Sequence, residues 1–262
     1  MSRSVVICAD DFGMSSDINA AILELIDNGR LSATSCMTTM PHWTVDAARE
    51  LVARRSKAAL GLHFNLTEGE DSISLGKLML HSLSGTLDRY RVRTQLELQL
   101  DNFESLVGSA PDFVDGHQHI QMFPVIRTIF LDTLQKRYGQ SMPWVRVSTP
   151  ALSGHDSGFK ALILRLIGLG FDRARRRAGI PGNTAFAGMY SLTPEADFGG
   201  MMRRWLASEP DGVLIMCHPA RKEAGSALSR ARQREYHWLA GNYFTEGLID
   251  SKRLLSTKPA LD

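Results

Sequence analysis

The stretch Ser-Val-Val-Ile-Cys-Ala-Asp-Asp-Phe-Gly, residues 4–13, decides the fold of this chain. Its first six residues form a short apolar run with three β-branched side chains, which is typical of a strand buried on both faces of a parallel sheet. Asp10 and Asp11 follow where the run stops, and Ser15 or Ser16 can cap a helix directly afterwards. The stretch therefore predicts a strand–turn–helix unit with two carboxylates at the end of its strand.

Strand-like and helix-like segments alternate along the rest of the chain. The expected strands are short apolar runs, and each expected helix carries one apolar stripe. We expect strands at residues 4–9, 32–38, 58–62, 113–115, 144–147, 184–186 and 212–216. We expect helices at residues 16–28, 45–55, 96–107, 126–134, 159–177, 198–206 and, as the last one, 227–240, with an irregular loop over residues 67–87.

The order of these segments predicts the fold class. About seven strand–helix units with no linker or repeat between them indicate a parallel sheet covered by helices, closed or nearly closed into a barrel. We therefore predict an α/β protein, a distorted (β/α) TIM-like barrel with about seven parallel strands, as one domain over residues 1–262. An open doubly wound sheet is the alternative. The first turn lacks Gly-x-Gly-x-x-Gly, so a dinucleotide cofactor is not supported.

Composition narrows the partners and the compartment. Apolar residues make up 44% of the chain, and its formal net charge of +2 gives no reason to expect nucleic acid or an anionic membrane. No stretch approaches the roughly 18 apolar residues of a membrane span, and the amino terminus lacks the apolar core of a signal peptide. Cys8, Cys36 and Cys217 lie in apolar runs and are interpreted as buried thiols. These features predict a cytoplasmic protein.

Residues that could bind a metal or transfer a proton follow four of the expected strands. They are Asp10 with Asp11, His63, His117 with His119, and His218. Catalytic groups of strand–helix barrels lie at the carboxyl ends of the strands and come from distant parts of the chain. One carboxylate and two imidazoles suit a divalent metal with open coordination positions. The pattern predicts a metal-assisted hydrolase.

Each of these residues also has a simpler interpretation on its own. The acidic pair could cap the following helix, and His63 could be a core histidine with its hydrogen bonds satisfied. His117 and His119 are two residues apart, so on an extended segment both imidazoles would face one site. Asp115 could orient His117 through its second ring nitrogen. Serine-based catalysis is disfavoured, because the chain has no Gly-x-Ser-x-Gly turn.

Five motifs resemble those of the YdjC-like carbohydrate deacetylase family, which includes chitooligosaccharide deacetylases. They are Ala-Asp-Asp-Phe-Gly at 9–13, Asn-Gly-Arg-Leu-Ser-Ala-Thr-Ser at 28–35, Gly-Leu-His-Phe-Asn-Leu-Thr at 61–67, Asp-Gly-His-Gln-His at 115–119 and Cys-His-Pro at 217–219. The resemblance covers nearly the whole chain. It implies a distorted strand–helix barrel that removes acetyl groups from N-acetylated sugars with a divalent metal, usually given as magnesium.

The resemblance also implies roles for individual residues. Asp11, His63 and His117 match the metal ligands of the family, Asp10 matches its proposed general base, and His218 matches its general acid. Magnesium is expected first because of the family, although two imidazoles and a carboxylate also suit zinc or manganese. The family tends to form homodimers, so a homodimer is expected as well.

Three further residues are expected close to the ligands or the sugar, namely Asp115, His119 and Gln121. Many family members have a histidine where this chain has Gln121. The segment 68–70 reads Glu-Gly-Glu in place of the commoner Gly-x-Pro form. Both departures lie near the expected sugar site and bear on the substrate.

The sequence thus predicts a metal-dependent carbohydrate N-deacetylase, a hydrolase of a linear amide C–N bond. Two alternatives stay open. A metal-dependent phosphoesterase would want more carboxylates to bridge two metals, or more Arg and Lys near the strand ends, and the sequence offers few there. A non-catalytic sugar-binding protein on the same fold would need no proton-transfer groups.

Overall fold

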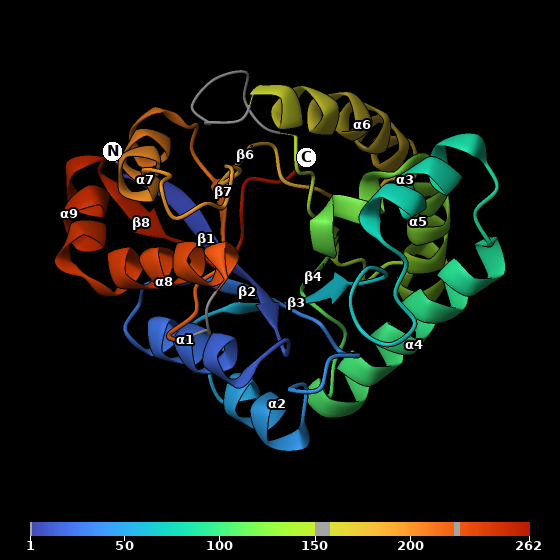
Figure 1. Cartoon of the computed structure of the whole chain (residues 1–262), viewed down its shortest axis with the longest axis horizontal. Coiled ribbons are helices and arrows are strands. Elements are labelled where there is room, and N and C mark those ends of the chain that lie inside the picture. Colours follow the sequence, from blue (N-terminus) through green and yellow to red (C-terminus); the bar gives the residue numbers. More distant parts are fainter. Residues whose placement is uncertain (1, 150–157, 223–225) are drawn as a thin grey trace.

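A curled sheet of parallel strands forms the centre of the molecule, and helices surround it (Figure 1). The computed structural model describes residues 2–149, 158–222 and 226–262. Within these residues the strands are β1 (Arg3–Phe12), β2 (Ala33–Cys36), β3 (Ala59–Phe64), β4 (Phe113–Gly116), β5 (Trp144–Val145), β6 (Phe186–Ala187), β7 (Val213–Cys217) and β8 (Arg253–Leu255). The helices are α1 (Ser16–Asp27), α2 (Val45–Val52), α3 (Leu75–Ser84), α4 (Arg89–Val107), the 3₁₀ helix η1 (His117–Met122), α5 (Pro124–Tyr138), α6 (Gly158–Arg177), α7 (Phe198–Ser208), α8 (Ala227–Ala240) and α9 (Asn242–Asp250).

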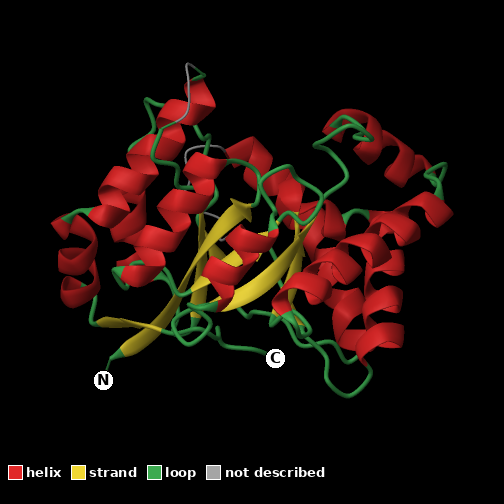
Figure 2. Cartoon of the chain, turned by 90° about the horizontal axis from the view of Figure 1, so that it is seen from below, coloured by secondary structure: helices red, strands yellow, loops and turns green. Residues whose placement is uncertain are grey.

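The strand order is β5-β4-β3-β2-β1-β7-β6, with β8 added beside the start of β1. The two end strands are linked by the segment that precedes β6, because the N–H of Val145 donates to the carbonyl of Pro181 at 2.9 Å. A parallel bridge between Val145 and Gly182 extends this link. The predicted distorted barrel with about seven parallel strands is therefore confirmed, and the open doubly wound alternative is not observed. Both termini lie at the end of the barrel opposite the arrowheads of the strands (Figure 2).

β1 is buried on both faces, as its apolar sequence predicts. Val6 and Cys8 belong to a core cluster that contains residues of all seven barrel strands and no helix residue, and therefore lies inside the barrel. Val5 and Ile7 belong to the larger cluster between strands and helices. All four side chains are fully buried. Because full burial of a Val or Ile contributes about 1.5–3 kcal/mol, this strand anchors both layers of the core.

Several helices begin and end close to the expected residues, for the expected reasons. Ser15 caps α1 by accepting the N–H of Ile18 at 3.2 Å. Gly108 ends α4 in the left-handed conformation, with φ 77°. Pro124 is the first residue of α5, where a missing N–H costs nothing.

Two predictions about the elements were wrong. The stretch 67–87 contains helix α3 and is not one irregular loop. The glycines at 69, 76 and 85 suggested a loop, although Leu75, Leu78, Met79 and Leu83 recur at helical spacing and Leu78 is buried. In addition, α8 is not the last helix, because α9 and β8 follow it.

Gly61 of β3 lies against the ring of Phe113 in the neighbouring strand β4, so its substitution tests the packing inside the sheet. A Cβ at this position would lie 2.4 Å from ring carbons of Phe113, whose ring stacks on Trp144 with 4.4 Å between centroids. We expect Gly61→Ala to lower the free energy of unfolding by about 1–3 kcal/mol, measured by chemical denaturation, because the stack must move.

The matched control is Gly76→Ala in α3, where an added Cβ meets nothing within 4 Å. Alanine favours helix over glycine, so this variant should be as stable as the wild type or slightly more stable. Equal destabilisation by the two substitutions would contradict the packing argument.

Candidate metal and acid–base site

The residues expected at the strand ends meet at the carboxyl end of the barrel. Asp10 and Asp11 lie near the end of β1, His63 lies in β3, His117 begins η1 directly after β4, and His218 follows β7. Parallel strands present their carboxyl ends on one side of the barrel, so residues from distant parts of the chain come together there. The structure therefore places all five around one point.

Asp11 is aimed by an irregularity in β1. The pairing of β1 with β2 shifts register between Ala9 and Phe12, and Asp11 has φ 70°. A non-glycine residue in this left-handed region costs about 1–3 kcal/mol and persists only where its surroundings hold it. Irregularities of this kind re-aim side chains beside active sites. Here the fully buried carboxylate of Asp11 is turned toward two imidazoles.

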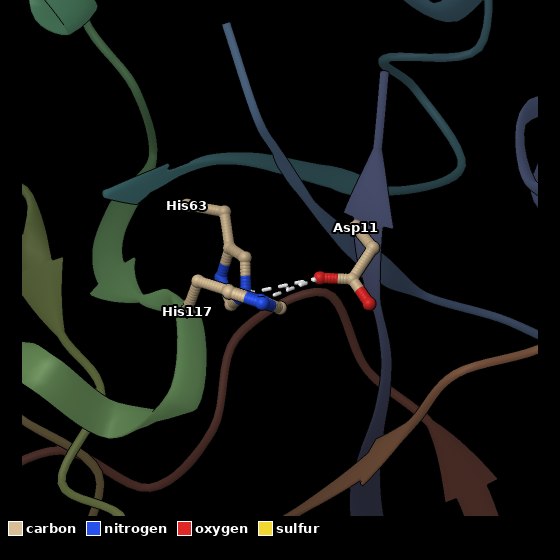
Figure 3. Close-up of side chains that lie close together, drawn as sticks. All are labelled: Asp11, His63 and His117. Atoms are coloured by element: carbon tan, nitrogen blue, oxygen red, sulfur yellow. Dashed lines mark hydrogen bonds and ion pairs between the residues drawn. The ribbon is translucent and has the colours of Figure 1, made fainter. Parts of the chain in front are cut away.

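Asp11, His63 and His117 form a compact cluster, called the ligand triad from here on (Figure 3). Oδ1 of Asp11 lies 3.0 Å from Nδ1 of His117 and 3.4 Å from Nε2 of His63. The two ring nitrogens are 3.3 Å apart. Ligands at about 2.0–2.2 Å around a four-coordinate ion are separated by about 3.3 Å. The donor atoms and their spacing therefore fit one divalent cation.

The charge around the triad also favours a cation. Three buried carboxylates, those of Asp10, Asp11 and Asp115, face the two guanidinium groups of Arg146 and Arg232, which leaves an excess of negative charge. Arg232 donates to Oδ2 of Asp11 at 2.5 Å, so only the other oxygen faces the imidazoles.

The pKa values of the triad follow from these neighbours. Burial raises the pKa of Asp11, but Arg232 and His117 outweigh burial and hold that pKa well below its usual range. Burial lowers the pKa of His63, whereas the carboxylates of Asp115 and Asp10 raise it to about 10. Asp11 is therefore ionised, and the environment of His63 attracts positive charge.

The second ring nitrogen of His63 is held by Asp115. Nδ1 of His63 and Oδ1 of Asp115 are 2.6 Å apart, because the β3–β4 register sets these residues side by side. The expectation that Asp115 orients His117 is therefore wrong. A carboxylate on the outer nitrogen of a histidine ligand fixes the ring and its tautomer. Asp115 thus prepares Nε2 of His63 to face the cation position.

His119 does not share the direction of His117. The segment that carries both is kinked, because Gln118 (φ 53°) and His119 (φ 61°) are left-handed and interrupt η1, so the extended conformation expected there is wrong. The ring of His119 packs edge-on against Phe186, 5.9 Å between centroids. Burial, aided by the nearby charge of Arg146, lowers the pKa of His119 to about 3, so this ring is neutral.

A fully buried guanidinium joins the two halves of the site. Arg146, just beyond β5, places Nη1 2.6 Å from Oδ2 of Asp10 and Nη2 2.5 Å from Oδ1 of Asp10. Nη2 also lies 2.5 Å from Oδ2 of Asp115. Burial raises the pKa of Asp10, but Arg146 and His63 together outweigh burial and hold that pKa well below its usual range. Asp10, His63 and Asp115 also lie close enough to bind a metal, but Arg146 already supplies the cation there.

Gln121 supports Arg146 and is fully buried behind the site. Its Nε2 donates to the carbonyl of Arg146 at 3.2 Å. A sugar at the mouth of the barrel has no access to this side chain. Gln121, where the family pattern has a histidine, therefore contacts Arg146 and not the substrate.

His218 is a second imidazole that approaches Asp10. Its Nε2 lies 4.0 Å from Oδ2 of Asp10, and its Nδ1 lies 3.8 Å from Oε1 of Glu235 in α8. Glu235 also accepts the backbone N–H of His218 and, at 2.5 Å, the hydroxyl proton of Tyr190. Glu235 thus anchors His218 so that one ring nitrogen is directed toward Asp10.

Sequence reasoning missed three charged residues of the site: Arg146, Arg232 and Glu235. Arg146 interrupts the apolar run 144–147 at the end of a strand, which is the same pattern that identified the acids and histidines. Arg232 and Glu235 are buried on α8, three residues apart on one helix face. Their charged helix gives no indication of which charges point inward.

Fold and site together define a strand–helix barrel with a group of residues that could hold a metal ion at the carboxyl ends of its strands. The chain belongs to the YdjC-like family, because the family model described as YdjC-like protein matches residues 4–249. Chitooligosaccharide deacetylases of Yersinia pestis and Yersinia pseudotuberculosis are each 28% identical over 236 residues, covering 84% of this chain and 83% of the relative.

Solved structures share the fold. A protein of Enterococcus faecalis described as a proposed cellobiose-phosphate cleavage protein superposes with a TM-score of 0.69 at 19% identity, over 98% of this chain and 97% of that one. A peptidoglycan N-acetylglucosamine deacetylase superposes with a TM-score of 0.51 at 11% identity, over 96% of this chain and 85% of that one. At these identities the comparison concerns the architecture alone.

Replacing Arg146 by methionine should test the buried ion pairs. Breaking such a pair costs about 3–5 kcal/mol, because it leaves uncompensated buried charge, and we expect a loss of that size at pH 7 in the metal-free protein. Since Arg146 depresses the pKa of Asp10, the wild type keeps this stabilisation above about pH 4 and loses it as the pH falls through the folded pKa.

In the Arg146→Met variant, burial raises the pKa of Asp10, so acidification relieves the unpaired charge. The difference in unfolding free energy between the two proteins should therefore shrink between pH 7 and about pH 4. Denaturant unfolding at a series of pH values measures it. A difference that stays constant over this range would show that Arg146 acts through packing and not through its charge.

Proposed function

We propose that the protein is a metal-dependent carbohydrate deacetylase, which hydrolyses the acetamide of N-acetylated sugars. The observation that carries this proposal is the convergence of a carboxylate, an imidazole and the ligand triad on one point. Oδ2 of Asp10 lies 3.9 Å from Nε2 of His63 and 4.0 Å from Nε2 of His218. The names of the Yersinia relatives support the same chemistry.

The ligand triad would hold the metal. Asp11 offers one carboxylate oxygen, and His63 and His117 offer one nitrogen each, which leaves positions open for water and substrate. The bound ion would supply Lewis-acid chemistry, polarising the amide carbonyl and lowering the pKa of water. Family resemblance puts magnesium first, whereas two imidazole nitrogens suit zinc or manganese at least as well.

Asp10 and His218 would transfer the protons. Asp10 is held ionised and in a fixed orientation by Arg146, so it can accept a proton from the attacking water. His218, whose Nε2 lies 4.0 Å from Oδ2 of Asp10, would donate a proton to the departing amine. An amine is a poor leaving group unless it is protonated, so the reaction needs a separate acid.

A hollow beside the triad would take the sugar. Its volume is about 370 Å³, within the range of small-molecule sites. Its lining residues are Thr39, Met40, Pro41, Asn65, Leu66, Glu68, Gly69, Glu70, Asp71, Ser72, Ile73, Arg91, Gln95 and Leu98. Glu68 belongs both to this hollow and to the surroundings of His117. A chitooligosaccharide, a single N-acetylated sugar and a lipid-linked glycan are the substrates to compare.

Metal analysis combined with product release separates this proposal from its two rivals. Acetate released from N-acetylglucosamine oligomers, lost on chelation and restored by added metal, is the expected result. Phosphate released from a generic ester would favour a phosphoesterase instead. Sugar retention without turnover would favour a non-catalytic sugar-binding protein.

We further infer that residues 1–262 form one domain, that the protein is cytoplasmic and that two identical copies form a dimer. Cys8, Cys36 and Cys217 are free and buried, which suits a reducing compartment. In the part of the chain that the structure describes, no helix combines the length and apolar character needed to cross a bilayer. The homodimer stays a prediction of the family resemblance, and light scattering measures it.

Two neighbouring acids should respond differently to substitution. Asp11→Ala removes a ligand of the triad and should abolish both metal binding and turnover. Asp10→Asn keeps the triad and should bind metal while its kcat falls by about 10²–10⁴-fold, the contribution of general-base catalysis. Metal content and acetate release measured on both variants check this, and a near-normal rate for Asp10→Asn would remove the base role.

The role of His218 is tested by the shape of a pH–rate profile. A general acid must be protonated, so the wild-type rate should fall at high pH as this acid loses its proton. His218→Ala should lose that limb together with about 10²–10⁴-fold in rate. An unchanged bell-shaped profile would mean that another group is the acid.

A further inference from the structure

The two histidines of the ligand triad differ in what holds them from behind. Nδ1 of His63 is bound to Asp115 at 2.6 Å. The outer nitrogen of His117, Nε2, faces a carboxylate as well, because Oε1 of Glu68 lies 3.8 Å away. Histidine ligands almost always donate their second N–H to a carboxylate, a carbonyl or a water, which fixes ring and tautomer. Glu68 occupies that position for His117.

The orientation of the His117 ring leaves little choice of tautomer. Nδ1 faces the cation position, since it is 3.0 Å from Oδ1 of Asp11 and 3.3 Å from Nε2 of His63. A neutral imidazole that offers Nδ1 to a cation must carry its proton on Nε2. That proton points toward Glu68, the carboxylate that can accept it.

Glu68 is delivered to this place by a tightly built turn. Oδ1 of Asn65 accepts the N–H groups of Thr67 and Glu68 at 2.9 and 3.0 Å, and Nδ2 of Asn65 donates to the carbonyl of Glu68 at 2.9 Å. Gln99 of α4, fully buried, binds the backbone of Asn65 at both its N–H (2.9 Å) and its carbonyl (2.7 Å). The backbone of Glu68 is thus tied to a helix, and its side chain alone is left to adjust.

We propose that Glu68 is a positioning residue, which accepts the Nε2 proton of His117 and so keeps Nδ1 available to the metal. The inference rests on the metal-dependent function proposed above. A separation of 3.8 Å is longer than a hydrogen bond, but such contacts often tighten only when a site is loaded. The Glu68 side chain is 41% exposed, so a rotation about its own bonds can close the distance.

The two supporting carboxylates then have different tasks. Asp115 is fully buried and bound to Arg146, so it is part of the rigid core of the site. Glu68 lines the hollow beside the triad and is open to whatever enters it. Metal affinity should therefore depend on Glu68 without the fold depending on it.

The test is a metal titration of chelator-treated protein with Zn²⁺ and, separately, Co²⁺. Removing the partner of a histidine ligand costs 10–100-fold in metal affinity, and for this half-exposed carboxylate we expect Glu68→Ala to raise Kd by about tenfold. Glu68→Gln, which keeps an acceptor oxygen, should recover part of the loss. The visible absorption of the Co²⁺-loaded Glu68→Ala variant should also shift, because the His117 ligand is less well held. Tm of the metal-free proteins should stay unchanged.

The matched control is Glu70→Ala, two residues along the same loop, which removes the same charge without touching His117. Its Kd should equal that of the wild type. An equal loss in both alanine variants would assign the effect to the general negative field and overturn the proposal. Wild-type affinity in Glu68→Ala would overturn it as well.

The same titration separates this inference from the proposed function. If the wild-type protein bound neither ion, both the metal-dependent function and the role of Glu68 would be contradicted. A wild type that binds metal tightly but releases no acetate from any N-acetylated sugar would remove the deacetylase alone. In that case the Kd values of the Glu68 variants still decide the positioning role.

Discussion

The site depends on one buried cation, the guanidinium of Arg146. Three carboxylates buried within a few ångströms of one another repel, and burying unpaired charge costs several kcal/mol. Arg146 offsets this by contacting Asp10 and Asp115 at once. Through Asp115 it fixes the ring of His63, and through Asp10 it fixes the expected base. The expected ligand and proton-transfer groups are thus held in place by one side chain that is itself fully buried.

Local backbone strain does the remaining positioning. The regular strands bring the right stretches of chain to one end of the barrel, but they do not by themselves aim the side chains. Asp11 is aimed by a shift in the β1 register, and His117 by a tight turn in which Gln118 and His119 have positive φ. Such conformations are costly and persist only where the surrounding structure holds them. Backbone strain concentrated at these residues is consistent with a functional role of the site.

The sequence predicted the site residues that can be recognised from their position at the end of an apolar run. Asp10, Asp11, His63 and His218 each stop an apolar run, and parallel strands bring such stops together. The contacts that were not predicted depend on how the strands pair in three dimensions. The contact of Asp115 with His63 follows from β3–β4 pairing, and that of Arg146 with Asp10 joins residues 136 apart in the chain. Helix α3 was missed because glycines at 69, 76 and 85 interrupt the stretch, although Leu75, Leu78, Met79 and Leu83 lie at helical spacing.

The division of Asp11 between two partners has a consequence for ion selectivity. Since Arg232 takes one carboxylate oxygen, Asp11 can offer a cation only the other, and the remaining donors of the triad are nitrogens. Calcium takes six to eight oxygen ligands and commonly a bidentate carboxylate, which this arrangement cannot provide. A small ion that accepts imidazole and keeps several positions for exchangeable ligands suits it far better. By binding one oxygen of Asp11, Arg232 would thus disfavour calcium at this site without being a ligand itself.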